Sequence, residues 1–350
     1  MKKFLAAILT IALAISLLAA CGGGNAKPSD GGNSGASSGE NHPAPSAEPA
    51  ADSNWPEREV RLIVPYGEGG GSHKVSLAIK EVSEKLGVMK KPFIAVCMPN
   101  AATLEGQEEV LYGDPDGYTI LMHHNAMING YALGKQDFTY DSFRMIGQIY
   151  ETPLAIAVRG DFPADDLNGL VEEIHNNPGK YKWTWAGSGG NTHFASYVFY
   201  NAAGISADEI VPCITKGDSD SVVQCVGGTA DIVIAQGNAL EEYVKSGDLK
   251  CLGSSAEDTI TVGGTEVPSW KSAGYDGTYN LRFFGFLPKD TPDEVANAVA
   301  DVFEKVVNSD EFAQSMAAQG IEPHWLPAGE AVAAFEAEAE KMNEIAKQMG

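Results

Sequence analysis

From residue 60 onward, the chain alternates short β-rich runs with stretches of helical spacing. Residues 60–64 (VRLIV) form the first β-rich run, and the next stretch places Val75, Ala78, Val82 and Leu86 three or four residues apart. This spacing puts the apolar side chains on one face of a helix. Strands that alternate with helices predict a mostly parallel sheet with helices packed on its faces. The alternation therefore predicts an α/β fold.

The same pattern predicts the elements further along the chain. Strands are expected at residues 92–98, 118–122, 154–158, 182–186, 210–214, 231–235, 249–253 and 283–287, and helices at residues 103–112, 166–175 and 329–349. Ser72 is expected to cap the first helix, and Thr291 to cap a later one that has Glu294 three residues on. The two C-terminal helices have no strands of their own, so we expect them to pack on the first part of the sheet.

The segment from residue 54 to residue 350 is long for a single hydrophobic core, so two domains are expected. We predict that residues 54–152 plus 281–350 form lobe I and that residues 153–280 form lobe II. The chain would then cross between the lobes twice, near Thr152 and near Asn280. A hinge of this kind suits closure around a ligand.

The first 53 residues predict where the protein is located. Lys2 and Lys3 precede an almost wholly apolar run at residues 4–20. The run is marginal against the roughly 20 apolar residues that a membrane span needs, and it ends in small residues, so it predicts a secretory signal. Residues 18–21 (LAAC) look like a bacterial lipobox, which predicts lipidation at Cys21. Residues 21–53 are rich in Gly, Ser, Ala and Pro and are predicted to form a disordered tether. We therefore expect an exported protein that is lipid-anchored at the outer face of the cell membrane.

The charge of the chain limits its partners. The formal net charge is −23, and removal of Lys2 and Lys3 with the signal takes it to −25. An excess of acidic residues argues against nucleic acid and against an anionic membrane surface as partners. It does not exclude a small anion, because the potential in a pocket can differ from that of the surface.

The cysteines point to no metal site. If Cys21 carries lipid, then Cys97, Cys213, Cys225 and Cys251 remain, and none of them has C-x2-C spacing. Disulfides are stable in exported proteins, so a bridge among the last three cysteines stays open.

Two glycine-rich loops are expected where a strand ends and a helix begins. We call residues 65–72 (PYGEGGGS) the first glycine loop and residues 187–192 (GSGGNT) the second glycine loop. In open α/β sheets, ligands bind beyond the carboxyl ends of strands, and a helix start offers unpaired N–H groups and a partial positive charge. One such loop alone is more simply a tight turn. A facing pair favours a site for an anion, held with little help from Lys or Arg.

The candidate ligand-binding residues lie on these loops and at the ends of neighbouring strands. They are Tyr66, Gly69, Gly70, Gly71, Ser72, His73, Asn125, Ser188, Gly190, Asn191, Thr192, His193 and Asn238. We expect Ser72 and Thr192 to supply hydroxyl donors to a carboxylate. Histidine titrates near pH ~6.5, so the charge of His73 would make binding depend on pH.

Signatures of common enzymes are missing from the sequence. The first glycine loop lacks the third glycine of a dinucleotide fingerprint, no GK[ST] motif is present, and Ser188 does not stand in a G-x-S-x-G motif. His123 and His124, with His73 and His193, lack H-x3-H spacing and are better interpreted as polar wall residues. We therefore expect a binding protein without cofactor or metal. The alternatives are a two-lobed hydrolase or dehydrogenase that uses Ser188 or the first glycine loop, and a sensor that reports to a signalling partner.

Several short motifs follow one another over the whole segment after the tether. They are residues 55–66 (WPEREVRLIVPY), the first glycine loop, and residues 114–121 (DPDGYTIL), 177–180 (NPGK), 227–231 (GGTAD), 284–288 (FGFLP) and 318–323 (AQGIEP). In their order and spacing, the sequence from Trp55 onward resembles the Bug family of extracytoplasmic receptors, the TctC type that serves tripartite tricarboxylate transporters. It departs from the family pattern at His73, where an acidic residue is usual, and at residues 98–102, where a glycine-rich stretch is common. Glu68 also adds a negative charge to the first glycine loop.

The resemblance implies a two-lobed, type II-like periplasmic-binding-protein fold whose two glycine loops grip a carboxylate. It implies a receptor that captures a di- or tricarboxylate, or a related organic acid, for a membrane permease of the tripartite tricarboxylate type. We expect the receptor to be a monomer. The identity of the ligand, and the choice between delivery and sensing, stay open at this point.

Overall fold

A computed structural model describes residues 54–349. The predicted signal at residues 1–20, the lipid attachment at Cys21 and the predicted tether at residues 21–53 lie outside the described residues.

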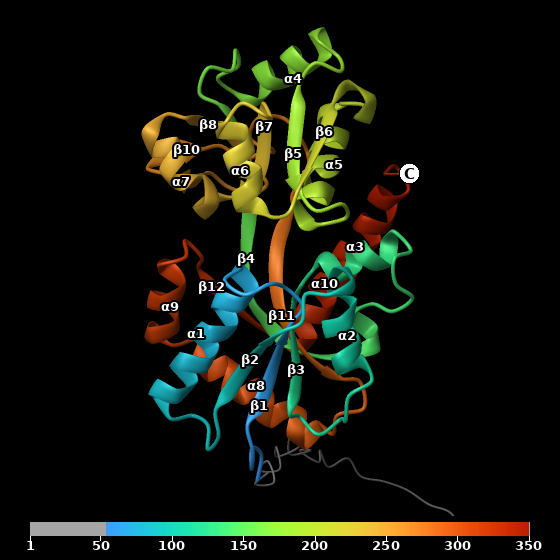
Figure 1. The fold of residues 1–350 in the computed structure, drawn as a ribbon, viewed down its shortest axis with the longest axis vertical. Helices are drawn as coiled ribbons and strands as arrows, with labels where there is room; N and C mark the ends of the chain where they lie inside the picture. Colours follow the sequence, from blue (N-terminus) through green and yellow to red (C-terminus); the bar gives the residue numbers. More distant parts are fainter. Residues whose placement is uncertain (1–53, 350) are drawn as a thin grey trace, which may run out of the picture. The chain divides into compact units, whose positions relative to one another are not determined.

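Strands and helices alternate along most of the chain (Figure 1). The strands are β1 (Val60–Val64), β2 (Phe93–Cys97), β3 (Thr119–His124), β4 (Phe143–Arg159), β5 (Lys182–Ala186), β6 (Val211–Thr215), β7 (Ile232–Gln236), β8 (Leu249–Ser254), β9 (Ile260–Val262), β10 (Thr265–Val267), β11 (Asn280–Pro288) and β12 (Pro323–Pro327). The helices are α1 (Gly71–Leu86), α2 (Leu104–Leu111), α3 (Ala126–Ala132), α4 (Leu167–Asn176), α5 (Asn191–Ala203), α6 (Asp218–Val226), α7 (Gly237–Ser246), α8 (Asp293–Val307), α9 (Asp310–Ala317) and α10 (Ala328–Ala346). The predicted α/β fold is confirmed.

The main sheet has the strand order β2-β1-β3-β11-β4-β7-β5-β6, with β8 and β12 also paired to β4. We call β1, β2, β3, β11 and β12, with the helices and loops next to them in the chain, the first half. We call β5 to β8, with their helices and loops, the second half. Within each half, the strands that precede helices pair in parallel: β1 with β2 and β3, and β5 with β6 and β7. A loop at the carboxyl end of β1 leads into α1, and a loop at the carboxyl end of β5 leads into α5.

Strand β4 joins the two halves (Figure 1). It is 17 residues long, and most of its residues are buried, as expected for a strand covered on both faces. Its first part pairs with β11, where Glu151 lies opposite Arg282, and its last part pairs with β7 and β8. The chain leaves the first half along β4 and returns into β11 at Asn280, so two crossings join the halves.

Helices cover both faces of the first half. Helices α1, α8 and α9 share one hydrophobic cluster with β1, in which Val75, Val299 and Phe312 are fully buried. Helix α10 belongs to a second cluster, where the ring of Phe335 lies 4.7 Å from that of Phe284 in β11. The C-terminal helices therefore pack on the first half, as expected, and α10 also contacts α5 of the second half.

Three details differ from the sequence predictions. The pairings of β4 and β11 are antiparallel, so the sheet is mixed and only the strands between helices are parallel. Ser72 does not cap α1, because the helix already begins at Gly71 with Gly70 as its N-cap. Thr291 does not cap α8, because its hydroxyl donates to the carbonyl of Pro288 and the helix begins at Asp293.

The cysteines of residues 54–349 are free thiols at Cys97, Cys213, Cys225 and Cys251. The disulfide that the sequence left open is therefore not formed. Within the same residues, no helix is both long and apolar enough to cross a membrane.

Candidate functional site

The two glycine loops have the same backbone. In each loop a glycine takes a left-handed conformation, Gly69 with φ +77° and Gly189 with φ +83°. Each loop then closes with a hydrogen bond between backbone groups three residues apart, from Gly70 to Gly67 (3.3 Å) and from Gly190 to Gly187 (3.2 Å). Glycine fits the left-handed position because a β-carbon there is strained. The two halves of the sheet therefore present the same local structure at two helix starts.

The N-cap residues of both helices are glycines. Gly70 precedes α1 and Gly190 precedes α5, with nearly equal dihedral angles, and neither helix start has a side-chain capping bond. The first N–H groups of a helix have no partner inside the helix. An N-cap Ser, Thr or Asp would normally satisfy one of them. With glycine in that position, these groups stay open to an anion.

A histidine occupies the third position of each helix. The N–H of Gly69 donates to His73 Nδ1 (2.9 Å), and the N–H of Gly189 donates to His193 Nδ1 (3.0 Å). Because Nδ1 accepts in both rings, the neutral histidine carries its proton on Nε2. The sequence analysis missed this equivalence, although the pattern G-x-G-G-x-[ST]-H occurs at residues 67–73 and again at residues 187–193.

The two histidines differ in their surroundings. His193 is buried and stacks on Trp185, with 4.4 Å between the ring centroids. Burial lowers the pKa of His193 to about 4, and the positive charge of Lys135 contributes to the same shift. His73 is half-buried on α1. His193 is therefore neutral at physiological pH.

The hydroxyl-bearing residues also differ between the loops. Thr192 Oγ1 accepts a hydrogen bond from the N–H of Ala186 (2.8 Å), which leaves its own proton free to donate. Ser72 is buried, and its hydroxyl has no hydrogen bond to another described residue. Both predicted hydroxyl donors thus stand in the first turn of a helix.

Asn191 joins the second glycine loop to the first half of the sheet. Its Oδ1 accepts from Tyr279 Oη (2.7 Å) and from Asn129 Nδ2 (3.4 Å). Its Nδ2 contacts His124 Nδ1 at 3.2 Å. The ring of Tyr66 stacks on that of His124, with 4.7 Å between the ring centroids. The first and second halves therefore meet through polar side chains at the carboxyl ends of β1, β3 and β5.

This junction is uncharged at neutral pH. Burial lowers the pKa of His124 well below its usual value, and lowers that of His123 to about 4. Burial also raises the pKa of the Tyr66 phenol well above its usual value. His123 donates from Nδ1 to the backbone carbonyl of His124 (2.7 Å). No group of three or more potential metal ligands occurs within residues 54–349.

Comparison with known proteins identifies the fold and its family. Residues 77–350 match the profile of the tripartite tricarboxylate transporter family receptor, TctC. This chain belongs to the TctC family.

Two relatives of this TctC-family chain come from Bordetella pertussis. One, a protein of the UPF0065 group, is 26% identical over 297 residues, which cover 83% of this chain and 88% of the relative. The other, protein BugT, is 22% identical over 283 residues, which cover 79% and 85%. The resemblance to the Bug and TctC receptors is therefore confirmed.

Two similar solved structures come from Rhodopseudomonas palustris. MatC with bound malate has a TM-score of 0.70 and 19% identity, over 83% of this chain and 100% of that one. Rpa4515 with adipate has a TM-score of 0.72 and 20% identity, over 84% and 98%. At these identities the likeness shows the shared periplasmic-binding-protein fold.

Two predicted site residues of the TctC-family chain lie at the starts of other helices, Asn125 as the N-cap of α3 and Asn238 as the second residue of α7. Asn125 is buried, and its side chain bonds to Glu338, to the carbonyl of Asn280 (2.9 Å) and to the N–H of Arg282 (3.3 Å). It therefore fixes the crossing into β11. Asn238 is exposed on α7, and its Nδ2 donates to the carbonyl of Gln319 in the first half. A role for either residue in ligand binding stays a prediction.

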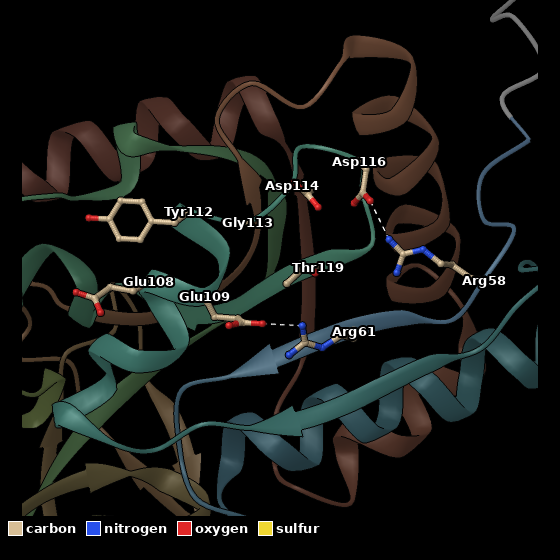
Figure 2. A pocket seen from close by; sticks show the side chains of 9 residues that line it. All are labelled: Arg58, Arg61, Glu108, Glu109, Tyr112, Gly113, Asp114, Asp116 and Thr119. Atoms are coloured by element: carbon tan, nitrogen blue, oxygen red, sulfur yellow. Dashed lines mark hydrogen bonds and ion pairs between the residues drawn. The ribbon is translucent and has the colours of Figure 1, made fainter.

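A pocket of about 330 Å³ lies at the opposite end of β1 and β3 from the glycine loops (Figure 2). Its arginines already have acidic partners, with Arg58 paired to Asp116 (2.8 Å) and Arg61 paired to Glu109 (2.6 Å). This end of the sheet therefore lacks the open donors that the helix starts provide.

Proposed function

We propose that this TctC-family receptor captures a small organic acid with two or more carboxylates outside the cell. It delivers the acid to the permease of a tripartite tricarboxylate-type transporter. The protein acts as a monomer, held at the membrane by lipid on Cys21, and it binds its ligand without chemical turnover.

The observation that carries the proposal is the pair of uncapped helix starts. Gly70 and Gly190 leave the first N–H groups of α1 and α5 without a side-chain acceptor, one in each half of the sheet. A carboxylate supplies the missing acceptor and the complementary charge. Malate and adipate, which are bound in two solved structures with the same fold, support the same class of ligand.

Ligand entry requires the halves to separate. Hydrogen bonds from Lys135 to Ser188, from Asn238 to Gln319 and between Asn191 and Asn129 join the two halves. We propose that residues 54–152 plus 281–350 move as one lobe and residues 153–280 as the other. The crossings in β4 and before β11 act as the hinge.

Calorimetric titration of the purified protein with malate, adipate and citrate tests the proposal. We expect binding of at least one acid with a Kd in the micromolar range or tighter. Native mass spectrometry of the protein as purified checks for a bound acid. If no acid of the three binds and no small carboxylate co-purifies, the proposal is wrong.

A variant at the first helix start separates the site from the fold. Gly70 has ordinary extended dihedral angles, and a β-carbon there would lie 3.2 Å from the carbonyl oxygen of Gly67. Gly70→Asp places a carboxylate where we expect that of the ligand, and it also caps α1. We expect at least a hundredfold loss of affinity without loss of stability. Gly70→Asn caps the helix without the charge, so it should lose affinity as well, but less than Gly70→Asp.

A further inference from the structure

One cation of the first half lies directly against the second glycine loop. Lys135 follows α3 and a left-handed turn at Gly134 (φ +64°), and its N–H donates to the carbonyl of Gly130 (2.9 Å). Its Nζ donates to the carbonyl of Ser188 at 2.7 Å. A β-carbon on Gly189 would lie only 2.8 Å from the same Nζ. The backbone of the turn thus directs the ammonium group onto the loop that starts α5.

Lys135 forms no ion pair with another described residue. No carboxylate of residues 54–349 lies within ion-pair distance of its Nζ. Arg282, at the crossing, has Glu151 at 3.1 Å and Glu338 at 3.7 Å. The acceptor that Lys135 does have, the Ser188 carbonyl, is uncharged. The positive charge therefore lies beside the loop that starts α5, where it contributes to the lowered pKa of His193.

The side chain of Lys135 has room to move. It is exposed, and it lines an open pocket of about 360 Å³ together with Leu104, Gln136, Phe138 and the acidic residues Glu108 and Asp137. Lysine carries a compact charge on a flexible stem, so its Nζ can change acceptors without a change in the backbone. A carboxylate is a stronger acceptor for an ammonium group than a neutral carbonyl.

We propose that Lys135 is a specificity-determining residue that selects ligands with a second negative charge. One carboxylate of the ligand occupies the helix starts, and Nζ exchanges the Ser188 carbonyl for the other carboxylate. The inference rests on the proposed function, since it assumes that the glycine loops bind an organic acid. It adds the reason why a diacid is preferred over a monoacid.

Pairs of ligands that differ in one carboxylate test the inference. The pairs are succinate with butyrate, malate with 3-hydroxybutyrate, and adipate with hexanoate. We expect the wild type to bind a diacid at least tenfold more tightly than its partner. Lys135→Met should lower the affinity for that diacid by about tenfold to a hundredfold and leave the affinity for the monoacid within twofold.

Two further variants complete the design. Lys135→Arg keeps the charge and should keep the preference for the diacid. Lys90→Met removes the same charge from an exposed site just before β2, at the end of the sheet away from the glycine loops, and should change neither affinity.

The outcomes separate the two proposals. Equal losses for diacid and monoacid in Lys135→Met would show that Lys135 only holds the loop, and would overturn the specificity role. Unchanged affinities would overturn it as well. A wild type that binds diacids and monoacids equally well overturns this inference and leaves an acid receptor. A wild type that binds none of the acids overturns the proposed function itself.

Discussion

Replacing Glu338 by glutamine should stabilise the protein at alkaline pH. Glu338 lies on α10, where its side chain is 13% exposed and bonds to Asn125. The charged groups around it are Arg282 on β11, Glu151 on β4 and Lys341 on α10. Burial raises the pKa of Glu338 from 4.5 to about 7, against the opposing effects of Asn125 and Arg282.

The magnitude follows from the size of this shift. The change from 4.5 to about 7 corresponds to ~3 kcal/mol, at about 1.36 kcal/mol for each pH unit. Because the folded protein holds the proton more tightly than the unfolded chain, this contribution is fully present below about pH 4.5. It is lost as the pH rises through about 7. Glutamine cannot ionise, so the variant does not lose it.

Calorimetric melting at several pH values between 5 and 8 measures the effect. The difference in Tm between Glu338→Gln and wild type should grow by about 4 °C over this range, given about 1.6 °C per kcal/mol for a protein with roughly 300 folded residues. Glu340→Gln, exposed on the same helix, removes the same charge and should show no such trend. The reasoning is wrong if the difference stays constant, or if it shrinks as the pH rises.

Two other predictions concern the anchor and the second glycine loop. Cys21→Ser should release the protein from the membrane fraction, and retention after a high-salt wash would contradict the lipid anchor. Thr192→Ala removes the acceptor of the Ala186 N–H, so it should lower the free energy of unfolding by about 1–3 kcal/mol. The Ser72 hydroxyl has no such partner, so Ser72→Ala should lower the free energy of unfolding by less than half as much. Equal losses in a denaturant titration would argue against the role of the Thr192 bond.

The local parts of the fold were predictable from the sequence. Short β-rich runs located β1, β2 and β5 to within a residue or two, because strands and amphipathic helices follow from the residue types and spacing of a short segment. The antiparallel pairing of β4 with β11, and the addition of β12, depend on contacts between distant segments and could not be predicted in this way. Pro323, for example, lies opposite Tyr150.

The same division applies to the candidate site. The glycine loops were recognisable because backbone conformation needs glycine at particular positions. The partners of these loops were not, since Lys135, Tyr279 and Glu338 reach them or the crossing from other parts of the chain. The equivalence of His73 and His193 is the exception, because the repeated motif was present in the sequence.

Two glycines of equal conformation test whether the halves touch in the ligand-free protein. Gly69→Ala and Gly189→Ala both place alanine at a positive φ, which costs about 1–2 kcal/mol. The new β-carbon at residue 69 meets nothing within 4 Å, whereas the one at residue 189 would lie 2.8 Å from Leu133 Cδ1 and from Lys135 Nζ. We therefore expect Gly189→Ala to lose about 0.5–1.5 kcal/mol more than Gly69→Ala in denaturant titrations, because the ends of these two flexible side chains must move aside. Adding Lys135→Ala should reduce the loss at residue 189 and leave that at residue 69 unchanged, because only residue 189 faces this side chain.

Equal losses in the two single variants would contradict this reasoning. They would mean that the segment around Lys135 does not contact the second glycine loop in the ligand-free protein, and that the two halves are then apart.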